Sequence, residues 1–292
     1  MKTRLLFLAL SCLLLFAATG FAQQPEGERK AGDRMVLTIN DVEYAFRWCP
    51  PGTFMMGSPA SEPGRESDER QHQVTLSRGF WMLETQVTQA MWESVMKNNP
   101  SHFKGDRLPV ETVSWNDSQE FITKLNELGI APEGFRFSLP TEAQWEYACR
   151  AGTTTAFSFG NTLNANQANF GMNVGRTTEV GSYPANVWGL YDMHGNVWEW
   201  CVDVFGTYPR GTVTDPVRTS RDLRRAIDGM FDTYSRDARG GPPRTPMDLH
   251  RVLRGGRWDF SARACRSAYR YGNDPLNRSS LIGFRLALVR AE

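Results

Sequence analysis

The chain has 292 residues and a formal net charge of +1, with 33 Lys and Arg against 32 Asp and Glu. This balance lacks the basic excess that is typical of proteins that bind nucleic acids or membrane surfaces, so we expect neither partner. The 26 glycines and nine tryptophans indicate a globular protein rich in loops and aromatic side chains, and they argue against a helical bundle.

The first 22 residues have the pattern of a secretory signal peptide. Lys2 and Arg4 precede an apolar run over residues 5–18, and small residues follow just before Gln23. The run is shorter than the roughly 20 residues of a membrane-spanning helix, although a retained anchor is the alternative. Removing residues 1–22 takes away two cations and no anions, which leaves a formal charge of −1. We expect a secreted or periplasmic protein with no membrane span after removal of the signal.

The rest of the chain predicts one domain behind a short leader. Residues 23–34 are polar and predict a flexible leader. No internal repeat or sharp change of composition divides residues 35–292. Within them, a polar and arginine-rich segment at about 206–247 predicts an insertion, with a short helix from about residue 220.

Alternating apolar residues predict β-strands near the start of this domain. MVLTI and YAFRW flank the turn residues Asn40 and Asp41, which indicates a hairpin. Residues 73–76 and 80–83 are also strand-like, and the segment over 59–71 is a polar loop.

Three helices are predicted after these strands, each from a capping residue and an apolar stripe. Thr88 precedes the first and Asn116 the second. Thr141 and Gln144 form a capping box for the third, which ends near Gly152.

Four cysteines follow the signal peptide: Cys49, Cys149, Cys201 and Cys265. An even number of cysteines in an exported protein suggests one or two disulfides. Their spacing does not decide which of them pair.

The segment YDMHGNVWEWC, over residues 191–201, is a candidate metal site. Asp192 and Glu199 lie seven residues apart around a turn at Gly195 and Asn196. Two carboxylates and the carbonyls of a turn are oxygen ligands of the kind that calcium prefers. Alternatively, Asp192 caps the turn and Glu199 pairs with an arginine.

Five arginines lie close to the C-terminus, and their role has two readings. Either they form buried ion pairs, or they form a basic surface at the base of a groove, where they bind an anionic or peptide ligand. These arginines are Arg263, Arg266, Arg270, Arg278 and Arg285.

Several motifs together resemble the sulfatase-modifying-factor family, which includes the formylglycine-generating enzymes. The resemblance covers about residues 45 to 290, and the motifs occur in the order that the family shows. They are CPPGTFMMGS (49–58), ETQVTQAMW (84–92), LPVETVSWNDSQEF (108–121), FSLPTEAQWEYACRAGT (137–153), VGSYPANVWGLYDMHGNVWEWC (180–201), RVLRGGRW (251–258) and GFRLA (283–287). The resemblance implies an α+β fold of the compact, irregular C-type-lectin kind, with few short helices and small antiparallel sheets.

The catalysts of this family oxidise a cysteine of a sulfatase to formylglycine and hold copper(I) with two cysteines. After the double glycine they carry a serine and then two cysteines, whereas this chain has Arg257 and Phe260 at the first two of these positions. Only Cys265 remains as a candidate catalytic thiol. One thiol cannot supply a low-coordinate copper(I) site, so copper is doubtful.

The resemblance also implies a disulfide and structural calcium. Counting back from AYR, Cys265 lies near the position of a structural cysteine, which implies a disulfide with Cys149. The implied calcium ligands are the Asp192 and Glu199 side chains and the Gly195 and Val197 carbonyls. A second, weaker calcium site would begin at Asn169 and Phe170, where no downstream acidic ligand is evident.

Two functions therefore stay open. The chain is an exported relative that oxidises a sulfatase cysteine or assists its maturation, with a sulfatase as partner. Alternatively, it is a non-catalytic, lectin-like module that binds a peptide, glycan or surface ligand in a C-terminal groove. The residues predicted to line the groove are Arg257, Trp258, Asp259, Phe260 and Arg263.

Overall fold

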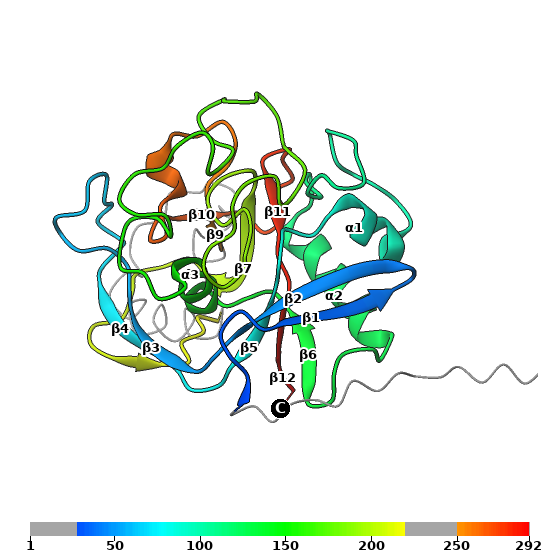
Figure 1. The fold of residues 1–292 in the computed structure, drawn as a ribbon, viewed down its shortest axis with the longest axis horizontal. Helices are drawn as coiled ribbons and strands as arrows, with labels where there is room; N and C mark the ends of the chain where they lie inside the picture. Colours follow the sequence, from blue (N-terminus) through cyan, green and yellow to red (C-terminus); the bar gives the residue numbers. More distant parts are fainter. Residues whose placement is uncertain (1–27, 220–249, 292) are drawn as a thin grey trace, which may run out of the picture.

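A computed structural model describes residues 28–219 and 250–291, and Figure 1 shows the arrangement of their elements. The predicted signal peptide, the start of the leader and the short helix predicted from about residue 220 lie outside the described residues. The described part contains short helices and three small, mostly antiparallel sheets, which confirms the predicted α+β class.

The largest sheet has five strands in the order β1-β2-β5-β12-β6. Its strands are β1 (Arg34–Ile39), β2 (Val42–Cys49), β5 (Phe80–Leu83), β6 (Phe135–Ser138) and β12 (Ala287–Arg290). β1 and β2 form the predicted hairpin, in which Ile39 pairs with Val42. Asn40 and Asp41 both have positive φ, 49° and 65°, as a tight two-residue hairpin turn requires.

Two smaller sheets complete the fold. One has four strands in the order β10-β9-β7-β11, and the other has three in the order β3-β4-β8. Their bounds are β3 (Gly52–Met56), β4 (His72–Leu76), β7 (Trp198–Val204), β8 (Val213–Thr214), β9 (Arg251–Arg254), β10 (Arg270–Asn273) and β11 (Ile282–Phe284). β4 and β5 confirm the strands predicted around residues 73–76 and 80–83.

The predicted helices are present, and one begins earlier than expected. Thr88 caps α1 (Gln89–Met96), and Thr141 caps α3 (Glu142–Arg150) with the predicted capping box. α2 (Trp115–Glu127) is capped by Ser114, not by Asn116. Ser114 is the cap because Asp117, three residues later, accepts the Ser114 amide N–H at 2.8 Å and so completes a capping box.

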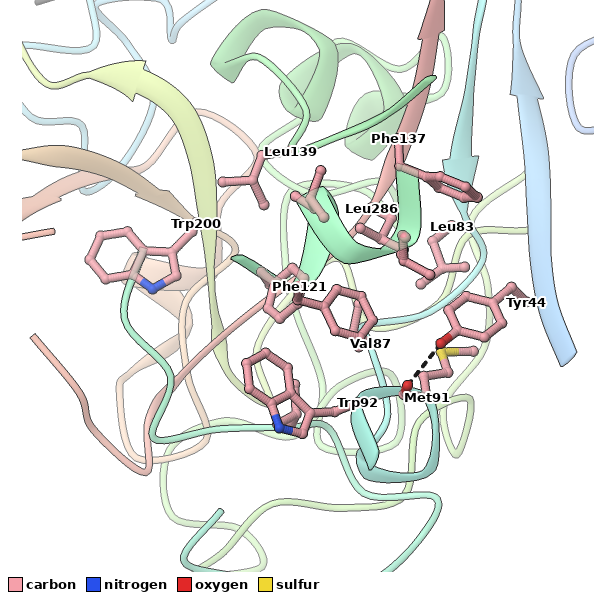
Figure 2. Close-up of a cluster of buried hydrophobic side chains, with 14 of the residues drawn as sticks. Tyr44, Leu83, Val87, Met91, Trp92, Phe121, Phe137, Leu139, Trp200 and Leu286 are labelled. Atoms are coloured by element: carbon pink, nitrogen blue, oxygen red, sulfur yellow. Dashed lines mark hydrogen bonds between the residues drawn. The ribbon is translucent and has the colours of Figure 1, made fainter. Parts of the chain in front are cut away.

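The main core lies between the five-stranded sheet and helices α1 and α2. Figure 2 shows its aromatic centre, where Trp92 of α1 stacks on Phe121 of α2 at 5.3 Å. The Tyr44 hydroxyl donates a hydrogen bond to the Met91 carbonyl at 2.8 Å and so ties β2 to α1.

Helix α3 lies against the smaller sheets, in contact with β3, β7 and β9. All its residues except Gln144 are buried, including Glu142, Glu146 and Arg150. None of the helices in the described residues reaches the length and hydropathy that a membrane span requires.

Candidate functional site

Three predicted segments meet next to α3: the turn over 192–199, the loop at Asn169 and the double-glycine loop. The Gly195 amide donates to the Gly255 carbonyl at 2.7 Å, and the Asn196 amide donates to the Asn169 carbonyl at 2.8 Å. Trp258 in turn donates its backbone N–H to the Asn196 carbonyl at 2.9 Å. Gly195 is required here because a Cβ would lie 2.2 Å from the Asn169 carbonyl oxygen.

The carboxylates of α3 hold the segment that follows the double glycine. Glu142 accepts two hydrogen bonds from the Arg270 guanidinium, at 2.7 and 2.6 Å. Glu146 accepts from Arg254, whose guanidinium also donates to the Ala268 and Ser267 carbonyls at 2.9 and 2.8 Å. This bidentate, charge-assisted bonding fixes the backbone of residues 267–270 against the helix.

The remaining C-terminal arginines are also paired. Arg266 and Arg285 form buried ion pairs with Glu69 and Glu199, respectively. Arg263 and Arg278 form exposed pairs with Glu66 and Asp117. All five arginines therefore have carboxylate partners, which favours a role in ion pairs over a basic surface that binds a ligand.

Cys265 lies beneath the double glycine and is fully buried. Gly256 has φ +80°, and a Cβ there would lie 2.5 Å from the Cys265 sulfur, so only glycine fits above the thiol. Burial raises the pKa of the Cys265 thiol to about 12. A reactive cysteine needs access and a lowered pKa, so this environment does not support the predicted catalytic role.

The structure does not form the predicted Cys149–Cys265 disulfide, and both cysteines are free thiols in it. The Cys149 sulfur lies 3.5 Å from the Ser267 hydroxyl, whereas the Cys265 sulfur lies 3.8 Å from the Ser261 carbonyl. The short 3-10 helix η3 (Ala262–Cys265) ends at Cys265. The residue opposite Cys149 is therefore Ser267, two positions beyond the predicted partner.

His194 is a buried, neutral histidine. It accepts the Ser158 amide N–H at Nε2 (3.1 Å), and its Nδ1 bonds the Cys265 carbonyl at 2.8 Å. An amide can only donate and a carbonyl can only accept, so Nδ1 carries the proton. Burial lowers the pKa of His194 to about 4. The nearby Cys149 thiol, whose pKa burial raises to about 12, is also neutral, so the two groups form no ion pair.

Protonation of His194 should destabilise the fold in acid. The folded pKa lies below the unfolded value of about 6.5, so the unfolded chain binds the extra proton as the pH falls from about 6.5 towards 4. We expect His194→Gln to remove about 2–3 kcal/mol of the stability loss that wild type shows between pH 7 and pH 4.5. Urea unfolding at both pH values measures this difference. The same substitution at the exposed His102 should leave it unchanged, and an equal pH dependence in wild type and His194→Gln would contradict the prediction.

Four of the five predicted groove residues lie together. The Arg257 guanidinium covers the Phe260 ring at 3.7 Å, and its Nε lies 2.9 Å from Asp259 Oδ1. The Trp258 ring meets Phe103 edge to face, and its buried Nε1 has no hydrogen-bond partner among the described residues. We name Arg257, Trp258, Asp259 and Phe260 the 257–260 surface.

Arg263 lies outside this surface, because it turns away to donate to the Gly64 carbonyl at 3.0 Å. The named groove residues did not include Tyr271, which is 48% exposed and stacks on Trp198 at 6.1 Å, beside Phe260. The sequence does not single it out, because only the folded strand β10 shows that Arg270 is buried and Tyr271 is exposed.

A cavity of about 310 Å³ lies away from the 257–260 surface. Its charged lining is already paired. Asp203 accepts the backbone N–H groups of Glu142 and Arg218, at 2.7 and 2.8 Å, and Arg270 is held by Glu142. Burial, with Glu142 nearby, raises the pKa of Asp203 to about 7.

The first predicted calcium site is assembled differently from the prediction. The Gly195 and Val197 carbonyls and Glu199 Oε1 converge, but on the side-chain amide nitrogen of Gln86. The Asp192 carboxylate instead accepts the Gly181 amide at 2.7 Å, and burial raises its pKa to about 6. These oxygens already have N–H donors, so the described arrangement does not fit a calcium ion.

The second predicted calcium site has one free oxygen. Asn169 is buried, its Nδ2 donates to the Arg176 carbonyl at 2.8 Å, and its Oδ1 has no partner among the described residues. The Phe170 carbonyl accepts the Asn173 amide at 3.1 Å. Residues 28–219 and 250–291 contain no group of three or more His, Cys, Asp or Glu that could hold a metal ion. Calcium at Asn169 stays a prediction.

Comparisons with known proteins match most of the described region. The family model described as "Sulfatase-modifying factor enzyme 1-like domain" matches residues 42–290. The formylglycine-generating enzyme of Mus musculus is 33% identical over 147 residues, which cover 45% of this chain and 36% of that enzyme. The chain spans between 20% and 63% of the lengths of three curated relatives that it matches.

Two solved structures share the fold over nearly their full length. Treponema denticola variable protein 1 is 28% identical with a TM-score of 0.69, and the match covers 87% of this chain and 98% of that one. PvdO from Pseudomonas aeruginosa is 27% identical with a TM-score of 0.70, over 89% and 99% of the two chains. Together with the match over residues 42–290, these likenesses show that the chain belongs to the sulfatase-modifying factor enzyme 1-like family.

Proposed function

We propose that this chain is a non-catalytic member of its family that binds a peptide segment of a partner protein. The observation that carries the proposal is the place of Cys265. It is the only thiol in the segment after the double glycine, it is fully buried, and burial raises its pKa to about 12. By the resemblance to the family's catalysts, Phe260 stands at the first of the two cysteine positions that a copper(I) pair would need.

The 257–260 surface and Tyr271 have the chemistry of a peptide-binding surface. Aromatic rings offer a large apolar area at low entropic cost, and tryptophan, tyrosine and arginine dominate binding energy in protein interfaces. The buried N–H of Trp258 has no hydrogen-bond partner among the described residues, so a peptide carbonyl that reached it would satisfy this donor. The Arg257–Asp259 pair, in which both side chains are only about a quarter exposed, offers one donor and one acceptor beside it.

We infer that the partner is an exported protein, and a sulfatase is the first candidate. The family description names sulfatase modification, and the mouse relative is named a formylglycine-generating enzyme. In this proposal the chain assists a sulfatase by holding its cysteine-containing segment without oxidising it. The predicted signal peptide over residues 1–22 supports a secreted or periplasmic location.

The test uses fluorescent peptides from exported proteins, including a sulfatase peptide of the CxPxR type. We expect polarisation to show binding that Arg257→Ala weakens by at least about tenfold, the loss typical of a hot-spot residue. The matched control is Arg263→Ala in the same segment, which should bind like wild type because Arg263 faces Glu66.

Mass spectrometry of the same peptides separates binding from oxidation. With copper and oxygen present, we expect no conversion of the peptide cysteine to formylglycine, whereas an active family member should convert it under the same conditions. Conversion that Cys265→Ser abolishes would establish the oxidase reading instead. Absence of binding to every peptide, or equal binding by wild type and Arg257→Ala, would contradict the proposal that the 257–260 surface binds a peptide.

A further inference from the structure

Gln86, in the loop before α1, lies at the point where the oxygens of the 192–199 turn converge. Its Nε2 is 3.1 Å from the Val197 carbonyl and from Glu199 Oε1. The Gly195 and Asp192 carbonyls lie at 3.4 and 3.5 Å. Calcium binds oxygen at about 2.3–2.6 Å, so these four oxygens surround an amide nitrogen at a spacing too wide for a calcium ion in its place.

Backbone groups determine which way the Gln86 amide points. The Thr178 N–H donates to Asn196 Oδ1 at 3.0 Å, and the Thr178 carbonyl accepts from Asn196 Nδ2 at 3.2 Å. Asn196 Nδ2 then donates to Gln86 Oε1 at 2.9 Å. Because a backbone N–H and a carbonyl cannot exchange roles, Asn196 and then Gln86 each have one orientation that satisfies all partners.

The negative charge in this cluster is already compensated. Arg285, fully buried, donates to both oxygens of Glu199 at 3.0 and 2.9 Å, and Trp145 Nε1 donates to Oε2 at 2.7 Å. A bidentate guanidinium is the strongest common partner for a buried carboxylate. With the N–H groups of Gln86 added, the turn satisfies its oxygens without a metal ion.

We propose that the Gln86 amide takes the place of a calcium ion in this chain, and that Gln86→Glu converts the cluster into a calcium site. The substitution replaces the central N–H donor with a carboxylate oxygen that faces three carbonyls and Glu199, an arrangement that requires a cation. A glutamate oxygen at the position of Nε2 would lie 3.1–3.5 Å from the four oxygens. Oxygens that share one calcium at about 2.4 Å lie about 3.4 Å apart in an octahedron, so this oxygen would be spaced as a fellow ligand of one calcium ion.

Thermal unfolding of the full chain in calcium and in EGTA tests the proposal. We expect the Tm of Gln86→Glu to fall in EGTA and to rise by at least about 5 °C at saturating calcium. Wild type should bind no calcium at this cluster. Calcium should therefore change the Tm of wild type and of Gln86→Met, which adds no oxygen ligand, by the same amount. Isothermal titration with calcium alone should show one additional site in Gln86→Glu.

Gln89 provides a matched control three residues away. It is buried like Gln86, and its Nε2 donates to the Phe103 and Pro109 carbonyls at 2.8 and 3.2 Å, but no carboxylate joins them. Gln89→Glu should therefore lose stability without recovering it in calcium. A wild type that responds to calcium as strongly as Gln86→Glu overturns the proposal. So does a Gln86→Glu protein that responds no more than Gln89→Glu, or that calcium cannot refold.

Discussion

Glu146→Gln is expected to lower the free energy of unfolding by about 3–5 kcal/mol, the usual cost of removing one partner of a buried ion pair. Glu146 is fully buried and accepts hydrogen bonds from the Gly57 amide (2.8 Å), from Arg150 (2.9 Å) and from Arg254. Glutamine keeps the size of the side chain but removes its charge and turns one acceptor into a donor. Arg254 would then be buried without its nearest anion. The next carboxylate, that of Glu142, lies 3.8 Å from the Arg254 guanidinium.

Urea unfolding measures this loss, and helix α2 provides the matched control. Glu120 also pairs with a basic residue four positions later, because Lys124 lies 2.9 Å away, but both side chains are about half exposed. Exposed pairs on helices contribute little, so Glu120→Gln should change the free energy of unfolding by less than about 0.5 kcal/mol. Equal losses in the two variants would show that the Glu146 network does not stabilise the fold as its burial indicates.

Ser267→Cys is expected to form a disulfide with Cys149 and to stabilise the oxidised chain by up to about 4 kcal/mol. The two side chains face each other in the core, with the Cys149 sulfur 3.5 Å from the Ser267 oxygen, and they are 118 positions apart. A crosslink over so long a loop removes much of the entropy of the unfolded chain. Burial raises the pKa of the Cys149 thiol to about 12, so the bond should form during oxidative refolding and not in the folded protein.

Peptide mapping without reductant identifies the bond, and unfolding with and without reductant measures its effect. The double variant Cys149→Ser, Ser267→Cys lacks the partner and should gain nothing on oxidation. Wild type should show free Cys149 and Cys265 under the same conditions. A wild-type peptide that links Cys149 to Cys265 would contradict the placement of Ser267 opposite Cys149.

Local features of this chain were predictable from the sequence because their causes lie within a few residues. The side chains of Thr141 and Gln144 each accept the other residue's backbone N–H, so four consecutive residues determine where α3 begins. The Asn40–Asp41 turn is equally local. The misplaced start of α2 shows the limit of this reasoning, because both Ser114 and Asn116 can cap, and Asp117 completes the box only with Ser114.

The sequence by itself determined the family, the α+β class and the segments that assemble the site, because short motifs and caps carry that information. Only the tertiary structure decided what those segments do. Gln86 meets the turn at Val197 across 111 positions, and Ser267 takes the place beside Cys149 that counting assigned to Cys265. Such contacts depend on how loops bend around an irregular core. A difference of two residues therefore places the Ser267 hydroxyl beside Cys149 in place of the Cys265 thiol. In the same way, the Gln86 amide lies where the sequence predicted a calcium ion.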